Sequence, residues 1–350
     1  MYLEGVSDVA TKNTQTPVGA PTKGRKALVY LSRYWQLYAM LAIPMVYFLI
    51  FKYLPMEYIV LAWKKYTFNT KLWDMEWVGW KHFIKAFNLN AADWGQESVI
   101  ESLKAILRGD FWLAVRNTIM LNLLDLFIGF PVPIIFALVL NELKLKRFKK
   151  VVQTVAYMPH FLSWVIIYSL SLQIFATSDG FINQLIGWGV QLFTGNKFDG
   201  IRFLSDPKLW VCVYILVGIW QSFGWNSIIY LAAITGISPE LYEAASVDGA
   251  NRLQKMIHIT LPGIRPTIVV LLIMAIGNIV GSGFDRPFAM RNNDVMDVAN
   301  VISTFVYTRG ILNSQFELST AVGLFQSVIG VIFLLGSNWF SKKMGDRGIF

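Results

Sequence analysis

The sequence predicts an all-α membrane protein whose core is a bundle of six transmembrane helices. Hydrophobic residues make up 55% of the 350-residue chain and charged residues only 15%, whereas soluble proteins carry about 25% charged residues. A helix of roughly 20 apolar residues crosses the hydrocarbon of a bilayer. Six runs of about this length or longer lie near residues 35–54, 116–140, 151–176, 209–235, 264–281 and 317–340.

The predicted transmembrane domain, residues 35–340, leaves a tail at each end of the chain. Residues 1–34 are predicted to be a disordered N-terminal tail because their first part is rich in Thr, Pro, Gly and Ala. Residues 341–350 form a short C-terminal tail. Short loops rich in Lys and Arg stay in the cytoplasm, and residues 141–150 contain five such side chains. With six spans, both termini and residues 238–262 are then expected to be cytoplasmic.

The charge and the aromatic residues both fit a membrane surface. The formal net charge of +9 is explained by loops that flank an anionic lipid leaflet, and it does not require nucleic acid as a partner. Segment 55–115 is rich in Trp, as is typical of the aromatic belt at a membrane interface. Within it, residues 78–87 and 110–117 are predicted to form short amphipathic helices that lie along the membrane.

A polar segment, residues 238–262, separates the fourth and fifth spans. Ser238 can cap a helix that begins at Pro239, and Gly249 can stop it. Asp248 or Asn251 can cap a second short helix that ends before Pro262. Small side chains beside an anion let another protein approach the backbone of this hairpin closely. The candidate docking residues are Glu243, Ala244, Ala245, Asp248, Gly249, Ala250, Leu261 and Pro262.

Polar side chains within the spans are costly in lipid and therefore mark candidate functional residues. The third to fifth spans combine aromatic rings, amides and hydroxyls, a mixture that suits the apolar faces and hydroxyl groups of a sugar. The same groups could instead bond neighbouring helices together, so both interpretations stay open for each residue. The candidate substrate path consists of Tyr168, Ser171, Gln221, Ser222, Trp225, Asn278, Ser282 and Asp285.

The sequence gives little support for nucleotide binding, metal binding, ion-driven transport or catalysis by this chain. No phosphate-binding G-x-x-x-x-G-K-[ST] loop occurs, so energy must come from another subunit or from an ion gradient. The three histidines lack partners at metal-ligand spacing, and His160, after Pro159, is interpreted as part of a helix kink with a hydrogen-bonded imidazole. An ion-driven transporter would need inverted repeats and buried ionisable groups, for which Asp125 is the main candidate. A membrane-embedded enzyme would need clustered acidic or His residues at one interface.

The hairpin sequence resembles the cytoplasmic coupling loop of ABC importer permeases. The shared pattern is E-A-A, three residues, G, and then I-x-L-P, which here is formed by Glu243, Ala244, Ala245, Gly249, Ile259, Leu261 and Pro262. Over about residues 28–350 the chain resembles the sugar-permease branch of type I ABC importers, and within it the polysaccharide-type permeases. The stretches that carry this resemblance are 117–118, 131–142, 153–164, 277–278, 301–311 and 321–325.

Two departures from the family pattern leave the substrate open. The N-terminal tail is longer than the family usually has, and Phe284-Asp285-Arg286 stands where many members have Phe-Glu-Gln.

The resemblance implies the MetI-like bundle fold and a transport subunit that is not itself an enzyme. It implies a bacterial cell-membrane complex with a second, homologous permease and two ATPase subunits that hold ATP and Mg. An extracellular solute-binding protein, of the lipoprotein type, would deliver an oligosaccharide derived from a polysaccharide, and oligosaccharides that contain uronate are among the candidates. The loop around Glu243 would dock in the ATPase, and transport would proceed by alternating access.

Overall fold

The computed structural model describes residues 30, 32–91, 99–143, 145–281 and 283–343, and its regular elements in this part of the chain are helices. One isolated antiparallel bridge joins Lys64 to Trp77. The chain divides into two units, Met1–Tyr58 and Ile59–Phe350. The all-α prediction is confirmed. Of the two predicted tails, only residues 30, 32–34 and 341–343 belong to the described part, so the disorder expected for 1–34 lies largely outside it.

One long apolar helix begins in the first unit. Helix α2 (Trp35–Phe48) continues through the π-turn η1 (Leu49–Tyr53) into η2 (Leu54–Trp63). Together they form a 29-residue candidate span, longer than the predicted 35–54. The helix passes Pro55 because the turn before it is wide. The N–H of Leu54 donates to the carbonyl of Leu49, five residues back, so the missing proline N–H interrupts the helix less than it would in a regular α-turn.

The second span is one continuous helix of 32 residues, Asp110–Asn141. It consists of α5 (Asp110–Leu124), the π-turn η5 (Asp125–Gly129) and α6 (Pro131–Asn141). The prediction of a separate interfacial helix at 110–117 is wrong, because these residues form the first turns of α5. As at Pro55, a wide turn precedes the proline at the start of α6, where Phe130 donates to the carbonyl of Asp125 at 2.9 Å.

The third predicted span, 151–176, is broken rather than straight. Helix α7 (Lys146–Tyr157) and the 3-10 turn η6 (Met158–Phe161) are followed by α8 (Trp164–Phe175), and the two halves meet at an angle of 104°. Pro159 cannot continue the ladder of hydrogen bonds. Leu162 is extended, and the Ser163 hydroxyl accepts from the N–H of Ile166 at 3.4 Å, which starts a new helix in a new direction.

The remaining predicted spans correspond to long helices. These are α10 (Pro207–Thr235), the composite helix Arg252–Gly277 and α17 (Phe316–Lys343). The described residues therefore contain five helices that are long and apolar enough to cross a membrane, and the bent pair makes a sixth if it counts as one span.

Shorter helices complete the second unit. They are η3 (Leu72–Asp74), α3 (Lys81–Ala86), η4 (Leu89–Ala91), α4 (Val99–Leu107), α9 (Phe181–Thr194), α11 (Pro239–Val247), α14 (Asp285–Met290), η8 (Asn293–Val295), α15 (Met296–Ala299), α16 (Ile302–Tyr307) and η9 (Thr308–Leu312). Of the amphipathic helix predicted at 78–87, the helical part is confirmed in shortened form as α3.

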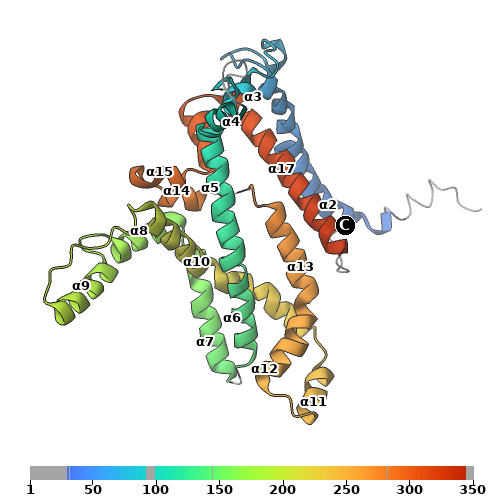
Figure 1. The fold of residues 1–350 in the computed structure, drawn as a ribbon. Coiled ribbons are helices and arrows are strands. Elements are labelled where there is room, and N and C mark those ends of the chain that lie inside the picture. The colour runs from blue at the N-terminus through green and yellow to red at the C-terminus, as the bar shows by residue number, and fades with distance from the viewer. Residues whose placement is uncertain (1–29, 31, 92–98, 144, 282, 344–350) are drawn as a thin grey trace, which may run out of the picture. The chain divides into compact units, whose positions relative to one another are not determined.

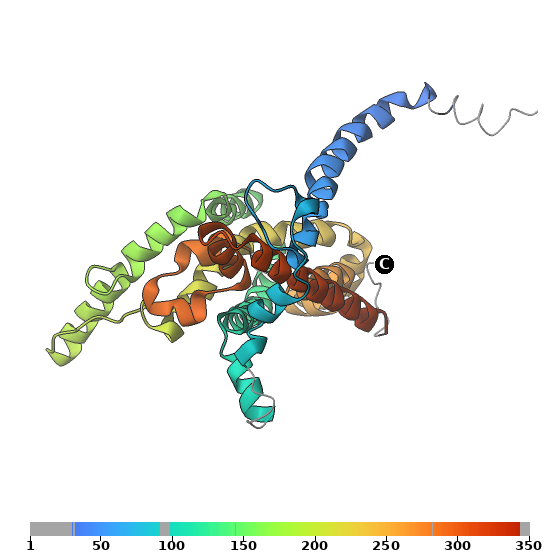
Figure 2. The same ribbon diagram turned by 90° about the horizontal axis from the view of Figure 1, so that it is seen from above.

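Helix α10 is at the centre of the second unit, where it packs against α6, α7 and α13 (Leu261–Gly277). Its fully buried Trp210 donates from the indole N–H to the carbonyl of Met290 at 3.0 Å, which ties α10 to the end of α14. Helices α11 and α12 (Arg252–Lys255) lie at one end of the unit and α3 and α4 at the other (Figure 1). Helix α8 packs against α14, and seen from above α9 extends away from the other helices of the unit (Figure 2).

Candidate functional site

The predicted hairpin at 238–262 forms an exposed helical corner. Helix α11 begins at Pro239, although the Ser238 side chain makes no capping hydrogen bond. Gly249 has φ +77°, a left-handed conformation that ends the helix at low steric cost. Of the two predicted caps for the second helix, Asn251 fills the role. Its side chain accepts from the N–H of Gln254 at 2.9 Å, and the Gln254 side chain accepts from the N–H of Asn251 at 2.7 Å.

The second helix of the hairpin does not end before Pro262, as the sequence led us to expect. Helix α12 runs through the π-turn η7 (Met256–Thr260) into α13, which gives one helix from Arg252 to Gly277. The N–H of Leu261 donates five residues back to Met256, and this wide turn accommodates the proline ring. The hairpin is therefore joined to the fifth span without a break.

The outer surface of the hairpin is open, whereas its inner contacts are specific. Glu243, Ala244, Asp248, Gly249, Leu261 and Pro262 are exposed, and Ala245 and Ala250 are half-buried. Lys255 donates to the Ser246 hydroxyl at 2.6 Å, and the hydroxyls of Tyr242 and Thr260 lie 3.0 Å apart. These bonds hold α11 against α12 and η7, which continue directly into α13.

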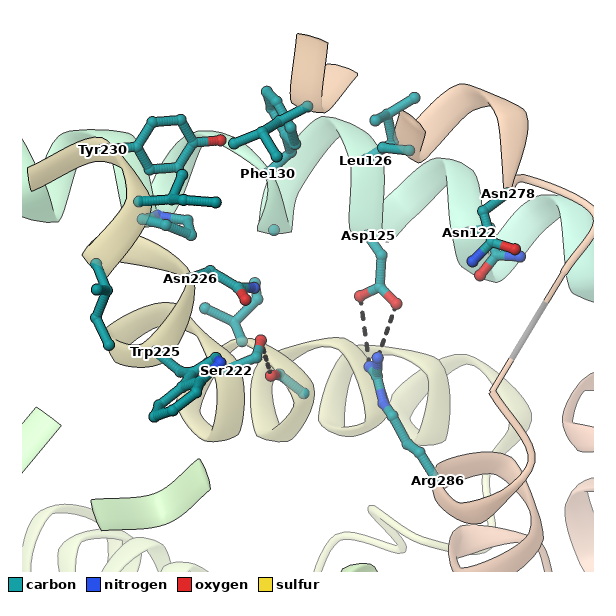
Figure 3. Close-up of a pocket in the computed structure, with 18 of the residues that line it drawn as sticks. Asn122, Asp125, Leu126, Phe130, Ser222, Trp225, Asn226, Tyr230, Asn278 and Arg286 are labelled. Atoms are coloured by element: carbon teal, nitrogen blue, oxygen red, sulfur yellow. Dashed lines mark hydrogen bonds and ion pairs between the residues drawn. The ribbon is translucent and has the colours of Figure 1, made fainter. Parts of the chain in front are cut away.

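A cavity of about 700 Å³ lies between the second span, α10, α13 and the segment that follows α13. Figure 3 shows its composition. Rings of Phe130, Trp225 and Tyr230 lie toward one end, and the amides of Asn122 and Asn278 lie toward the other, beyond Asp125. The volume falls within the roughly 300–1,000 Å³ of ligand-binding pockets. Aromatic faces and amide edges together suit a ligand that is apolar on some faces and polar on others.

The cavity also contains an ion pair between Asp125 and Arg286. The guanidinium Nη1 lies 2.7 Å from Asp125 Oδ2, and Nη2 lies 3.4 Å from Oδ1 (Figure 3). Nη2 also donates to the carbonyl oxygen of Tyr214 at 2.5 Å, and the guanidinium carbon lies 3.7 Å from the centre of the Tyr214 ring. The guanidinium passes so close to Gly218 that a Cβ atom there would overlap it.

The structure brings three of the predicted path residues to the cavity, namely Ser222, Trp225 and Asn278. Others have different surroundings. Ser171 is buried and donates to the carbonyl of Ile167 at 2.8 Å, and Gln221 donates to the carbonyl of His160 at 3.3 Å. Tyr168 packs against the buried cluster around Trp210, on the part of the third span that follows the 104° bend.

The last two predicted path residues follow α13. Asp285 is exposed at the start of α14, and Ser282 lies outside the described residues.

Sequence reasoning missed Arg286 as a cavity residue. It singled out 284–286 as a departure from the family pattern, and that was the available signal. Arg286 lies in the six-residue helix α14, after the fifth span. The hydrophobic pattern of the sequence cannot show that its side chain contacts Asp125 of the second span. Phe130 and Tyr230 were also missed, because each is part of an apolar run in which no face is distinguished. Asn226 lies in the fourth span next to the predicted Trp225 and also lines the cavity, although it was not among the predicted path residues.

The expectation of a hydrogen-bonded imidazole at His160 is wrong. Its Nδ1 is buried and has no hydrogen-bond partner in the described part of the chain. The ring instead stacks on the indole of Trp225, with centroids 4.5 Å apart and planes at 4°. Because Pro159 breaks the helix here, His160 turns toward α10 and packs through its ring face.

Comparison with known proteins identifies the family of the chain. The family model described as binding-protein-dependent transport system inner membrane component matches residues 114–346. The chain belongs to this family.

Two relatives are similar over nearly the whole chain. The permease is 43% identical over 328 residues to the polygalacturonan/rhamnogalacturonan transport system permease protein YteP of Bacillus subtilis (strain 168), covering 94% of both chains. It is 40% identical over 343 residues to Protein LplB of the same organism, covering 98% of this chain and 100% of that one.

The fold is also that of a solved ABC transporter. A chain of a bacterial ABC transporter involved in import of the acidic polysaccharide alginate matches with a TM-score of 0.75 and 36% identity, over 91% of this chain and 99% of that chain. A structure of a bacterial alginate ABC transporter in complex with an alginate pentasaccharide-bound periplasmic protein matches with the same TM-score and identity. The expected MetI-like permease fold is confirmed.

These matches decide between the three classes left open by the sequence. The chain is a multi-pass transmembrane permease subunit of an ABC importer that depends on a binding protein, and it is not an enzyme. The interpretations as an ion-driven transporter and as a membrane-embedded enzyme are therefore rejected.

Proposed function

We propose that this permease imports an acidic oligosaccharide and that the cavity between the second, fourth and fifth spans is part of the substrate path. The observation that carries the proposal is the lining of that cavity. Rings of Trp225 and Tyr230 offer faces for sugar rings, and Asn122, Ser222 and Asn278 offer groups for hydroxyls. A sugar inside the bundle must replace hydrogen bonds to water, and each unmade bond costs about 1–3 kcal/mol.

The named relatives support an acidic substrate. One is named for transport of polygalacturonan and rhamnogalacturonan, and the solved transporter imports alginate, an acidic polysaccharide. This permease resembles them at 43% and 36% identity over more than nine tenths of its length. An oligosaccharide that contains uronate is therefore the substrate class we assign.

The exposed hairpin is the proposed contact with the ATPase. Its anionic and small residues, Glu243, Ala244 and Gly249, are accessible, and its second helix continues into the fifth span. Docking of α11 in an ATPase cleft would move that span when the ATPase dimer closes around ATP and Mg. The bundle would then alternate between outward-open and inward-open states.

The assembly that we propose contains one copy of this permease, a second homologous permease, two ATPase subunits and an extracellular binding protein. Both termini and the hairpin face the cytoplasm. That placement agrees with the structure, in which the hairpin and the Lys- and Arg-rich start of α7 lie at the same end of the second unit (Figure 1).

The test is uptake by the reconstituted assembly. Vesicles that contain both permeases and the ATPase, supplied with the binding protein and internal ATP, should accumulate an oligouronide against its gradient. Omission of the ATPase should abolish accumulation. Accumulation by this chain alone, or failure of the complete assembly to import any of a panel of acidic and neutral oligosaccharides, would contradict the proposal.

A further inference from the structure

Two opposite charges face each other inside the cavity. Of the described residues that line it, only Asp125 and Arg286 carry a charge. They come from places 161 residues apart in the sequence, the π-turn η5 in the second span and the short helix α14 after the fifth. Ionisable side chains within a membrane bundle are rare and usually have a functional role, so this pair requires an explanation.

The guanidinium is held in a fixed position. The guanidinium lies over the ring of Tyr214, and its Nη2 donates to the Tyr214 carbonyl. It crosses α10 at Gly218, where the absence of a side chain leaves space for it. These contacts do not depend on Asp125. The group is thus oriented toward the second span by α10 and would keep that orientation if the carboxylate moved.

The carboxylate, by contrast, is the more accessible partner. The Asp125 side chain is 33% exposed and that of Arg286 is 15% exposed. Asp125 lies at the start of η5, and π-turns of this type are frequent at functional sites. The Nε–H of Arg286 is buried without an acceptor in the described part of the chain, so the fixed guanidinium is incompletely satisfied in this conformation.

We propose that Arg286 is a specificity-determining residue that binds a carboxylate of the transported oligosaccharide, and that Asp125 occupies its place when the cavity is empty. This inference rests on the proposed function of the cavity as a sugar path. A planar guanidinium matches a carboxylate through two parallel hydrogen bonds. A uronate carboxylate can therefore replace that of Asp125 without leaving the buried cation unpaired.

The exchange also accounts for release. When a substrate carboxylate binds Arg286, the displaced Asp125 must turn into the open cavity and take water as its partner. Its return competes with the substrate, so the site binds weakly, as transport requires. A neutral oligosaccharide leaves the ion pair intact and gains nothing from Arg286. An acidic sugar can thus take the place of Asp125 on Arg286, whereas a neutral sugar of the same length cannot, and we expect the cavity to distinguish the two.

The experiment compares two substrates in the complete reconstituted importer, an oligouronide of fixed length and the same oligosaccharide with its carboxyl groups reduced to alcohols. Arg286→Gln should lower uptake of the oligouronide about tenfold or more, the effect of losing a hydrogen bond between charged groups. It should lower uptake of the reduced form much less. Arg286→Lys keeps the positive charge but lacks the two parallel donors. Its uptake of the oligouronide should lie between that of the unaltered importer and that of Arg286→Gln.

A double variant separates recognition from stability. Asp125→Asn combined with Arg286→Gln removes both charges, so it should restore membrane abundance if the single variants lower it, but it should not restore uptake of the oligouronide. Arg309→Gln is the matched control, because Arg309 pairs with Asp110 at 2.5 Å outside the cavity. It should leave the preference between the two substrates unchanged.

Two results would overturn the inference while leaving the proposed function intact. One is that Arg286→Gln lowers uptake of both substrates by the same factor. The other is that the uncharged double variant regains oligouronide uptake, which would show that the pair only holds the helices together. Failure of the unaltered importer to carry either substrate would instead contradict the proposed function itself.

Discussion

The imidazole of His160 lies flat against the indole of Trp225, with ring centroids 4.5 Å apart and planes at 4°. His160 belongs to the break between α7 and α8, and Trp225 belongs to α10 and lines the cavity. The stack therefore joins the bend of the third span to the wall of the proposed sugar path. Phe161 packs edge-on against the same indole at 5.6 Å, so the ring of Trp225 is held in one orientation.

Replacement of Trp225 should impair transport more than it impairs assembly. In Trp225→Ala the cavity loses an oriented ring face, and we expect uptake to fall several-fold while membrane abundance is largely retained. Trp225→Phe should keep part of the activity, because a smaller ring can still stack. Uptake divided by abundance is the quantity to measure. A loss of uptake that only follows abundance would show that Trp225 packs the bundle and does not contact the substrate.

Gly218 should resist even the smallest substitution. A Cβ atom at this position would overlap the guanidinium carbon of Arg286, which is itself held between Tyr214 and Asp125. Gly218→Ala should therefore destabilise the folded bundle by about 1–3 kcal/mol, the usual cost of overpacking. The matched control is Gly336→Ala in α17, where nothing lies within 4 Å of the new methyl group.

Thermal unfolding of the two glycine variants in detergent provides the comparison. A lower Tm for Gly218→Ala, with an unchanged or higher Tm for Gly336→Ala, would confirm the close approach of Arg286 to α10. Equal Tm values for both variants would show that the guanidinium does not cross α10 at Gly218.

The sequence predicted the helical class and most spans because lipid imposes one simple requirement, a run of about 20 apolar residues. It did not predict where spans bend or merge. Pro55, Pro131 and Pro262 all lie within continuous helices because a wide π-turn precedes each of them, whereas Pro159 ends a helix. Pro44 and Pro266 lie inside α2 and α13 without a π-turn directly before them, so a proline in the sequence does not by itself reveal whether the helix continues.

The candidate site was predictable to the extent that it is local in sequence. The hairpin with Gly249 and Asn251 depends on capping rules that act over a few residues, and the structure has both. The cavity depends on a contact between residues 125 and 286 and on the direction of α8 after the bend. Tyr168 and Ser171 were placed on the path by assuming a straight third span. The 104° bend moves them away from the cavity.

Charge reversal on the hairpin tests the coupling proposal. Glu243 is exposed beside Ala244 on α11 and is available to a partner. Glu243→Lys should leave the permease in the membrane but abolish ATPase activity that is stimulated by the binding protein and substrate. Glu243→Gln, which keeps the shape and removes the charge, should cause a smaller loss. Normal transport by Glu243→Lys with an unaltered ATPase would contradict docking at this residue.

The conformation of Gly249 allows a second, independent test of the hairpin. Its φ of +77° is rarely adopted by other residues, and nothing lies within 4 Å of a Cβ atom built there. Gly249→Val should therefore strain the turn through its backbone alone and misplace α11 relative to α12. We expect reduced coupling, measured as transported substrate per ATP hydrolysed, with the abundance of the permease retained. Gly323→Val in α17 is a control for added bulk, since a Cβ there also meets nothing.

His82 should make the stability of the segment around α3 depend on pH. It lies in α3, and its Nε2 is 3.1 Å from the carbonyl oxygen of Lys64. Burial lowers the pKa of His82 from its ordinary 6.5, against a smaller opposing effect of Glu317. The folded state therefore binds the proton less readily than the unfolded state does. The free energy of unfolding should be constant above about pH 6.5 and should decrease as the pH falls from there toward the folded pKa.

The measurement is Tm in detergent at a series of pH values, for the unaltered permease and for His82→Gln. Glutamine keeps an N–H donor for the Lys64 carbonyl but cannot be protonated, so the decrease below pH 6.5 should become shallower in the variant. His258 provides a control. It is exposed on the hairpin, and His258→Gln should leave the pH dependence as it is in the unaltered permease. An identical decrease in Tm for all three proteins would show that another group is responsible for the acid sensitivity.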